Sequence, residues 1–249
     1  MGNGMRELEP WYQLGYITPH TFVDTVPYQF YRLAPQGMML VTANLDLADY
    51  ALEAVERELP LFWRHVATLA KRKVNRIVLA GVPVTAALGR ERVRALLDEV
   101  RDRVSIPADT DLEAIIAAMH HLGIERIAIG SRWYESLNTA VGDYLGLAGI
   151  EVVTRRASAR SLAENEIHSH ADGMRLAVEL GRQALRASPG AQGLLLPGGL
   201  WIAIHAVRLL EAEFDKPVFL NLNSTLWAAL RGSERRAEIE GWGKLLASL

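Results

Sequence analysis

The chain has 249 residues, of which 50% are hydrophobic and 22% are charged, with a formal net charge of −2. This length supplies one large domain or two small ones, and the dispersed, balanced charge argues against a nucleic-acid partner. The sequence contains no cysteine, which excludes disulfides, thiolate zinc sites and thiol nucleophiles. Its apolar stretches are too short for a membrane span, and the first residues lack an apolar signal region, so we expect a cytoplasmic protein without a membrane partner.

Short apolar runs alternate with amphipathic stretches along most of the chain. Runs rich in Val, Ile and Leu predict buried parallel strands over residues 12–17, 38–42, 76–80, 106–108, 126–129, 151–154, 193–196 and 218–220. The amphipathic stretches between them predict helices over residues 47–71, 90–104, 112–121, 135–147, 171–187, 200–214 and 225–230. Repeated β–α units of this kind indicate parallel sheets with helices on both faces.

The same order of units occurs twice, which indicates an internal duplication. In each half the third strand ends at a Gly or Pro turn, and the fourth strand follows a proline. We therefore predict an α/β fold of two similar Rossmann-like (flavodoxin-like) parallel-sheet halves, related by pseudo-two-fold symmetry, with a cleft between them. The predicted halves are residues 1–122 and 123–249, and a terminal helix after residue 232 is expected to pack back on the first half.

The two Gly turns are the first candidates for a binding site, since open α/β sheets bind ligands at the carboxyl ends of their strands. Gly198 and Gly199 are expected to open a helix and to present backbone N–H groups to an anion. Gly81 with Val82 offers a weaker second site, because proline provides no donor. Two apolar-flanked anion sites predict a small carboxylate ligand with an apolar body. The aromatic and aliphatic residues expected beside it are Trp133, Phe22, Val82 and Trp201.

Several segments resemble one enzyme superfamily, in the same order along nearly the whole chain. The opening Gly15-Tyr16-Ile17-Thr18-Pro19 and the ending Thr225-Leu226-Trp227-Ala228-Ala229-Leu230-Arg231 resemble maleate cis-trans isomerases. The turn Leu194-Leu195-Leu196-Pro197-Gly198-Gly199-Leu200 resembles that of arylmalonate decarboxylases. The wider group comprises the Asp/Glu racemases, the maleate isomerases and the arylmalonate decarboxylases. The resemblance implies the two-half fold and a site between the halves.

The resemblance does not extend to the thiol chemistry of that group. The racemases and isomerases carry a cysteine at each turn, whereas the decarboxylases carry glycine at the first turn and cysteine at the second. This chain has Gly81 at the first position, as the decarboxylases do, and Pro197 at the second. The family tyrosine aligns with Trp133, and Tyr134 follows it. A mechanism through a cysteine is therefore excluded.

Polar residues after the predicted strands are the remaining candidates for chemistry. A neutral His20 hydrogen-bonded to Asp24 would serve as a general base, because histidine titrates near working pH; the alternative is an ordinary loop histidine. Tyr134 would protonate an enolate or hold a carboxylate, or else simply pack. Asp111 either contacts substrate or caps the following helix. The resemblance places Asn165 and His168 beside the site, and His168 is a further candidate for acid–base catalysis. The other predicted substrate-binding residues are Thr21, Ser131, Arg132 and Asn223.

A second reading concerns the segment His168-Ser169-His170-Ala171-Asp172. Imidazole and carboxylate groups at this spacing suit Zn²⁺ or Fe²⁺, so a metal-dependent hydrolase is one alternative. The helix that follows offers a simpler explanation, in which Ser169 or Asp172 is a cap. Another alternative is a carboxylate-binding or regulatory protein that has lost catalysis.

The preferred hypothesis is a cysteine-independent lyase or isomerase that acts on a small carboxylic acid through an enolate-like intermediate. Decarboxylation and elimination or hydration are favoured, because Gly81 matches the decarboxylase pattern and an anion site stabilises an enolate without a nucleophile. We expect no cofactor and no bound metal. A homo-oligomer is also expected, since these are common among soluble α/β enzymes.

Overall fold

The computed structural model describes residues 9–161, 164, 169–235 and 239–249. In these residues each predicted apolar run forms a strand, with ends that shift by one to three residues. The strands are β1 (Tyr12–Thr18), β2 (Met38–Asn44), β3 (Arg76–Leu79), β4 (Ala108–Thr110), β5 (Arg126–Ser131), β6 (Glu151–Ala157), β7 (Gly193–Leu195) and β8 (Val218–Phe219).

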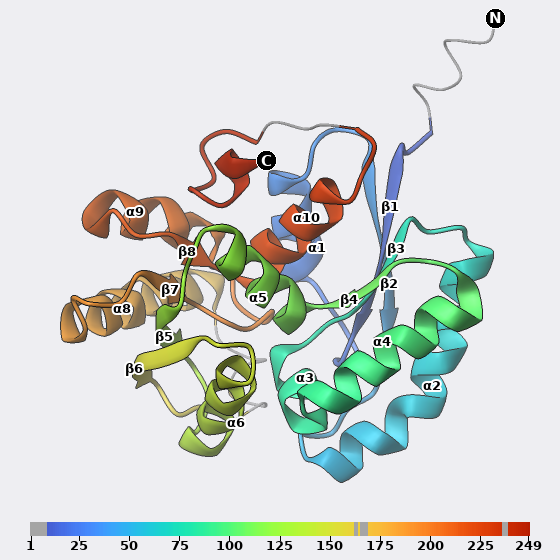
Figure 1. Ribbon diagram of the computed structural model, residues 1–249, viewed down its shortest axis with the longest axis horizontal. Coiled ribbons are helices and arrows are strands. Elements are labelled where there is room, and N and C mark those ends of the chain that lie inside the picture. The colour runs from blue at the N-terminus through green and yellow to red at the C-terminus, as the bar shows by residue number, and fades with distance from the viewer. Residues whose placement is uncertain (1–8, 162–163, 165–168, 236–238) are drawn as a thin grey trace, which may run out of the picture.

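The strands form two separate four-stranded sheets with the same internal order. One sheet has the order β2-β1-β3-β4 and the other β6-β5-β7-β8, and all their pairings are parallel. Figure 1 shows the first sheet on the right and the second on the left. The predicted α/β fold of two similar parallel-sheet halves is therefore confirmed.

Each helix predicted between residues 47 and 230 is present, with starts or ends that shift by up to five residues, and two further helices occur. The helices are α1 (Thr25–Leu33), α2 (Leu52–Lys71), α3 (Val82–Leu88), α4 (Arg90–Val104), α5 (Asp111–His121), α6 (Glu135–Gly146), α8 (His170–Ala187), α9 (Ile204–Phe214) and α10 (Asn221–Arg231). The helices α1 and α3 were not among those predicted. Each contains a proline, Pro27 or Pro83, in its first turn, where a missing N–H is tolerated.

Near the chain end the described residues form only a short 3₁₀ segment, Leu246–Ser248, where an α-helix was expected. Its Ser248 hydroxyl lies 3.1 Å from Nε2 of His121 in α5, so this segment contacts the middle of the chain. No helix in the described part of the chain is both long and apolar enough to span a membrane.

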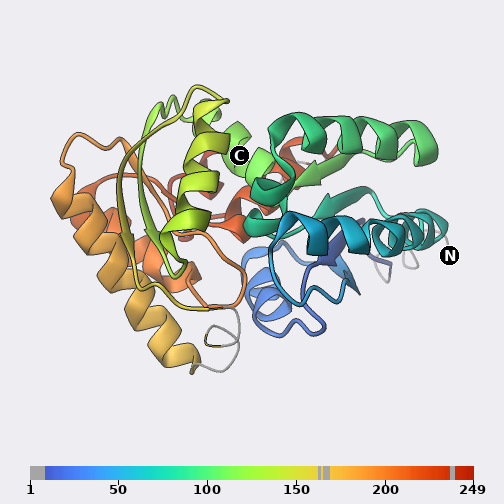
Figure 2. The ribbon, with the colours of Figure 1, turned by 90° about the horizontal axis from the view of Figure 1, so that it is seen from below.

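Two helices from distant parts of the sequence lie between the sheets. α5 and α10 pack against each other in the centre of the molecule, and both views show them between the two sets of strands (Figures 1 and 2). They bury Leu112, Ile115, Leu226 and Ala229, each fully inaccessible to solvent. At 25 cal/mol per Å² of apolar surface, such burial is a major source of stability.

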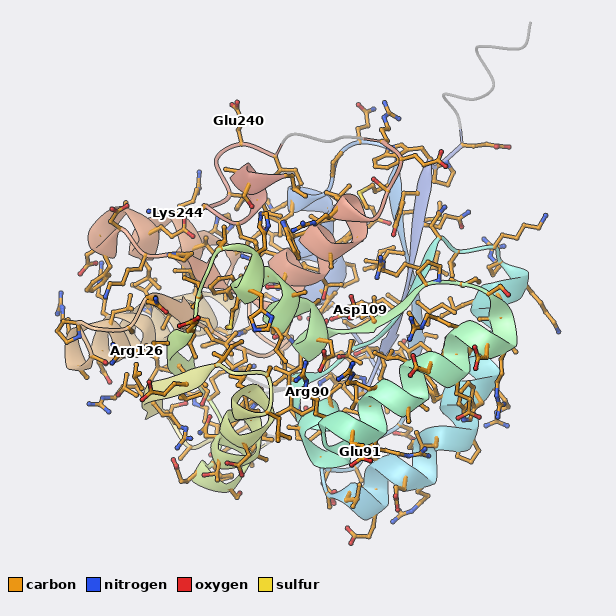
Figure 3. All side chains as sticks on the ribbon, in the orientation of Figure 1. Arg90, Glu91, Asp109, Arg126, Glu240 and Lys244 are labelled. Carbon is orange, nitrogen blue, oxygen red and sulfur yellow. The ribbon has the colours of Figure 1, made fainter. Side chains whose placement is uncertain are left out.

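Polar contacts also join α4 and α5, from the first half of the chain, to α6, from the second half. Arg90, at the start of α4, lies near the middle of the molecule in Figure 3. Its Nε lies 2.8 Å from Oε1 of Glu113 in α5, and its Nη1 donates to the carbonyl of Leu147, after α6. Tyr144 in α6 donates to the same Glu113 oxygen. These bonds hold α4, α5 and α6 in a fixed arrangement.

Candidate functional site

A narrow cavity of about 30 Å³, partly open to solvent, lies at the carboxyl ends of both sheets. This is the position at which parallel α/β folds bind ligands. Its lining comes from both halves of the chain: Tyr16, Thr18, Pro19, His20, Val23, Val26, Tyr50, Ala80, Gly81, Pro83, Asp111, Arg132, Trp133, Gly198, Gly199, Leu200 and Asn221. Both Gly turns therefore border one cavity, as the sequence predicts.

The glycine in each turn has a backbone conformation that favours glycine. The φ angle is +96° at Gly81, after β3, and +116° at Gly198, after β7. A side chain at either position would be strained, because L-residues rarely adopt such angles. A Cβ at Gly81 would also lie 3.0 Å from Cγ of Pro19. The turns thus need glycine for their shape.

Asp111 lies fully buried between the two turns and accepts four different donors. Its carboxylate receives the Gly81 N–H at 2.8 Å, the Asn221 amide at 2.9 Å and the Thr225 hydroxyl at 2.9 Å, with the Tyr16 hydroxyl at 3.1 Å. Burial raises the pKa of Asp111, while the donors oppose that rise. Four donors and no hydrogen-bond acceptor fit the ionised carboxylate. Asp111 is not the helix cap; Thr110 is, through a bond from the N–H of Glu113.

Asn221 makes the corresponding hydrogen bond in the second half of the chain. Its Oδ1 accepts the Gly198 N–H at 2.9 Å, just as Asp111 accepts the Gly81 N–H. Of the backbone donors expected to bind an anion, the N–H groups of Gly198 and Gly81 are therefore bonded to the protein's own side chains. A further part of that expectation is wrong, because α9 begins at Ile204 and the Gly198-Gly199 turn does not open a helix.

The unexpected helix α1 holds the second turn in its extended shape. The Thr25 hydroxyl donates to the Gly199 carbonyl, and the Gln29 amide donates to the Trp201 carbonyl at 3.1 Å. The side-chain oxygen of Gln29 accepts the N–H groups of Ala203 and Ile204, at 2.9 and 3.2 Å. Gln29 thus satisfies the amino end of α9 from another part of the chain. This bonding explains why the helix starts later than its sequence pattern suggests.

Arg132 supplies the cavity with a buried positive charge. The residue is 2% exposed, follows β5 and lies with its guanidinium 4.8 Å from the ring centre of Trp201. Its Nη1 also lies 3.4 Å from the Leu200 carbonyl. Burial lowers the pKa of Arg132 to about 9, so the group still carries its charge at neutral pH. A guanidinium in a cavity is well suited to bind carboxylate.

His20 and Tyr50 form a contact inside the cavity. Nε2 of His20 lies 3.3 Å from the Tyr50 hydroxyl. Burial, with a smaller effect from the Arg132 charge, lowers the pKa of His20 to about 4, so the ring is neutral at pH 7. The expected pairing with Asp24 is wrong: Asp24 is exposed, accepts the N–H of Thr25 at the start of α1 and lies 3.8 Å from His170. Asp24 is therefore not a cavity residue.

Other predicted site residues lie outside the cavity lining. Tyr134 is 51% exposed and borders a separate groove of about 490 Å³. Ser131 and Asn223 are buried but bond to their own turns, to Asn138 and to the backbone of residues 218 and 220. The remaining residues outside the lining are Thr21 and Phe22, which are exposed, and Val82, Pro197 and Trp201, which are buried. Asn165 and His168 lie outside the described residues.

The described part of the proposed metal segment has another role. Ser169 caps α8 by accepting the N–H of Asp172, and the Asp172 carboxylate accepts the Ser169 hydroxyl and pairs with Arg175. Among the described residues no group of three His, Asp or Glu side chains is placed to hold a metal ion. His168 is not among them, so the segment is only partly described.

Sequence reasoning missed four lining residues that matter for the chemistry. Tyr16 lies within β1 and has the alternation of a core residue, although its hydroxyl reaches Asp111. Thr18 is the last residue of β1, Tyr50 lies just before α2, and Asn221 is the first residue of α10. A search for polar residues at the ends of strands, applied to Thr18, would have found it.

The comparisons with known proteins agree with this geometry. A family model described as arylmalonate decarboxylase matches residues 14–246. The arylmalonate decarboxylase of Bordetella bronchiseptica is 23% identical over 233 residues, which cover 93% of this chain and 95% of that protein. The superfamily inferred from the turns and the chain ends is thus confirmed.

Solved structures show the same fold. A substituted arylmalonate decarboxylase in its liganded form superposes with a TM-score of 0.83 at 21% identity, covering 94% of this chain and 98% of that one. The maleate isomerase from Pseudomonas putida S16 gives a TM-score of 0.83 at 21% identity, covering 95% and 98%. The maleate cis-trans isomerase of Nocardia farcinica, bound to TRIS, gives 0.82 at 16% identity, covering 95% and 98%.

Proposed function

Because the chain belongs to the arylmalonate decarboxylase family, we propose that it is an enzyme of the lyase or isomerase class that acts on a small carboxylic acid. The observation that carries this proposal is the buried Arg132 guanidinium in a cavity at the carboxyl ends of both sheets. The relatives named above, a decarboxylase and maleate isomerases, support the same class of substrate.

The cavity suits a substrate with a charged end and an apolar body. Arg132 provides the charge, while Trp133, Val26 and Leu200 provide apolar surface. Desolvation strengthens the attraction between guanidinium and carboxylate, because few water dipoles remain to screen it. A neutral small molecule would gain little from this arrangement, so charge is the first basis of selection.

We favour decarboxylation, or elimination or hydration, through an enolate. In a decarboxylation the bond between the α-carbon and one carboxylate carbon breaks, CO₂ leaves, and the electron pair remains as the enolate of the second carboxyl group. The Arg132 charge stabilises the oxygen that becomes more negative. The α-carbon then takes a proton from the Tyr50 hydroxyl, which is bonded to neutral His20, and solvent returns the proton.

A panel of substrates tests this function. Aryl- and alkyl-substituted malonates and maleate would be incubated with the protein, and CO₂ release and product formation measured by NMR in D₂O. Decarboxylation is expected to place one deuterium on the α-carbon of the product. Iodoacetamide should leave the rate unchanged, because the chain has no thiol. Saturable binding of these acids without any turnover would instead support a binding protein.

Two matched pairs of variants locate the proton transfer. Tyr50→Phe and His20→Gln are expected to lower kcat about 10²-fold or more, the typical contribution of general acid–base catalysis. Tyr134→Phe and His170→Gln change the same residue types outside the cavity lining and should keep at least half of the activity. Equal losses in the two pairs would contradict the assignment of Tyr50 and His20.

A further inference from the structure

The cavity between the two Gly turns is too narrow to enclose a whole substrate. Its volume of about 30 Å³ suits a group the size of about two water molecules. Sites that enclose a small organic ligand have volumes of about 300–1000 Å³. The reacting end of an acid therefore fits in the cavity, while the rest of the molecule needs a second space beside it.

A groove of about 490 Å³ adjoins the cavity, and Tyr50 and Trp133 border both spaces. The groove lies between the two halves of the chain. Ala87, on α3, borders it from the first half, and Leu137 and Ala140, on α6, border it from the second half. These two helices lie against each other, as Figure 1 shows. The groove is therefore continuous with the site at which we place the chemistry.

The walls of the groove are mostly apolar. Ala87, Leu137 and Ala140 are half-buried against the core, and the small alanine side chains leave the space between the helices open. The half-exposed ring of Tyr134 adds aromatic surface, which a phenylalanine at this position would also supply. Exposed apolar surface of this kind, gathered in a groove, is typical of a ligand site.

The charged residues of the groove do not favour an ion of either sign. Its described lining contains one acidic residue, Asp49, and one basic residue, Arg160. The Asp49 carboxylate already accepts the N–H of Ala51 at 2.8 Å. Opposite charges in one groove largely cancel, so apolar contact selects the occupant. A hydrocarbon group fits these walls better than a second charged group does.

We propose that this groove is the subsite for an apolar substituent on the α-carbon of the substrate acid. The reacting end lies in the cavity, and the substituent extends past Tyr50 and Trp133 into the groove, where it contacts Leu137 and Ala140. This assignment rests on the proposed function and narrows it. The preferred substrates are acids that carry an extended hydrocarbon chain, rather than short acids such as maleate.

Two alkylmalonates that differ in chain length test the subsite by calorimetric titration. Each buried methylene group should strengthen binding about threefold, so 2-octylmalonate is expected to bind at least about a hundredfold more tightly than 2-methylmalonate. Octyltrimethylammonium has the same chain with a positive charge, and should bind at least about a hundredfold more weakly than octylmalonate. Equal binding of the cation would show that the protein takes up any chain, which contradicts the subsite.

Variants that fill the groove locate the binding of the chain. Ala140→Phe and Ala87→Phe place a ring in the groove from opposite walls, and each should lower the ratio of octylmalonate to methylmalonate affinity at least about tenfold. Thr139→Phe introduces the same ring at the neighbouring, exposed position of α6, outside the groove lining, and should keep the ratio within about twofold. Circular dichroism and urea unfolding identify the variants that are folded.

The subsite is wrong if the wild-type protein binds the two malonates equally or binds neither. It is also wrong if a folded Ala140→Phe or Ala87→Phe protein keeps the wild-type ratio of affinities. Turnover separates these results from those for the proposed function. If octylmalonate binds in the groove while no acid in the panel is converted, the function fails and the subsite stands. If acids are converted while chain length changes neither affinity nor KM, the subsite fails and the function stands.

Discussion

Asp111 and Asn221 are joined by a 2.9 Å hydrogen bond, and each is the first residue of the helix that follows the last strand of its sheet. Each also accepts the N–H of a glycine with positive φ, Gly81 for Asp111 and Gly198 for Asn221. The hydrogen bonds thus repeat in both halves and meet at their junction. The symmetry is broken by charge, because one residue is a carboxylate and the other an amide.

This difference in charge predicts the result of Asn221→Asp. Two buried carboxylates would then lie within hydrogen-bond distance, and their repulsion should cost about 3 kcal/mol or more in unfolding free energy. The proton shared by such a pair has a raised pKa in the folded state. The loss of unfolding free energy should therefore grow as pH rises from 5 to 8. Urea unfolding at both pH values measures it.

The exchanged double variant provides the control for that experiment. Asp111→Asn combined with Asn221→Asp restores one carboxylate and one amide, and should be more stable than Asn221→Asp alone. A double variant that is less stable than either single variant would show that repulsion is not the cause.

His20 predicts a dependence of stability on pH. Its pKa is about 4 in the folded protein, against an ordinary value of 6.5, because of burial and the Arg132 charge. The unfolded chain therefore takes up a proton first, and stability is lost as pH falls from 6.5 toward 4. A shift of this size corresponds to at most about 3 kcal/mol.

The comparison with His20→Gln isolates this effect. Burial raises the pKa of Asp109 to about 6, which acts in the opposite direction over part of the same range, but Asp109 is present in both proteins. The difference in unfolding free energy between wild type and variant should narrow as pH falls from 7 to 4.5. A constant difference would contradict the lowered pKa.

The two neighbouring glycines predict opposite outcomes for alanine. At Gly198 the φ angle of +116° disfavours any side chain, and the new methyl group would lie 3.6 Å from Nη2 of Arg132 in the cavity. Gly198→Ala should therefore weaken malonate binding at least tenfold. At Gly199 a Cβ would meet only Cγ2 of Val26 at 3.4 Å, so Gly199→Ala should bind within about threefold of wild type. Equal malonate affinities of Gly198→Ala and Gly199→Ala would show that the shape of the turn at Gly198 does not affect binding.

Gln29 predicts a large effect on stability from one uncharged side chain. Gln29→Leu removes the acceptor of two buried N–H groups and the donor to Trp201, so it should lower the unfolding free energy by about 3 kcal/mol. Gln183→Leu, on the exposed face of α8, should change it by less than about 0.5 kcal/mol. Urea unfolding measures the unfolding free energy of both variants. A small change for Gln29→Leu would mean that water replaces the amide.

The strands could be predicted from sequence because their signal is local. A buried strand needs a short apolar run, and each run, from Tyr12 to Phe219, carries its own pattern. The start of α9 could not be predicted in this way. It depends on Gln29, which is more than 170 residues away, and the sequence of residues 200–203 does not indicate that partner.

The same distinction separates the predicted from the missed parts of the site. Gly81, Gly198 and Arg132 follow strands, so the topology alone brings them to the cavity. The partner of His20 could not be inferred, because Asp24 is nearer in sequence while Tyr50 is nearer in space. Tyr16 looked like a core residue, since a strand pattern does not reveal what its hydroxyl touches.

The bonds of Asp111 also bear on the order in which this chain is expected to fold. Two of its four donors, Asn221 and Thr225, lie 110 and 114 residues later in the sequence. During synthesis the first sheet emerges long before them, and its central carboxylate stays only half satisfied until the last helix arrives. Contacts of such long sequence separation are slow to form. We therefore expect the final step of folding to be the docking of α10 on α5, with ligand binding appearing in that same step.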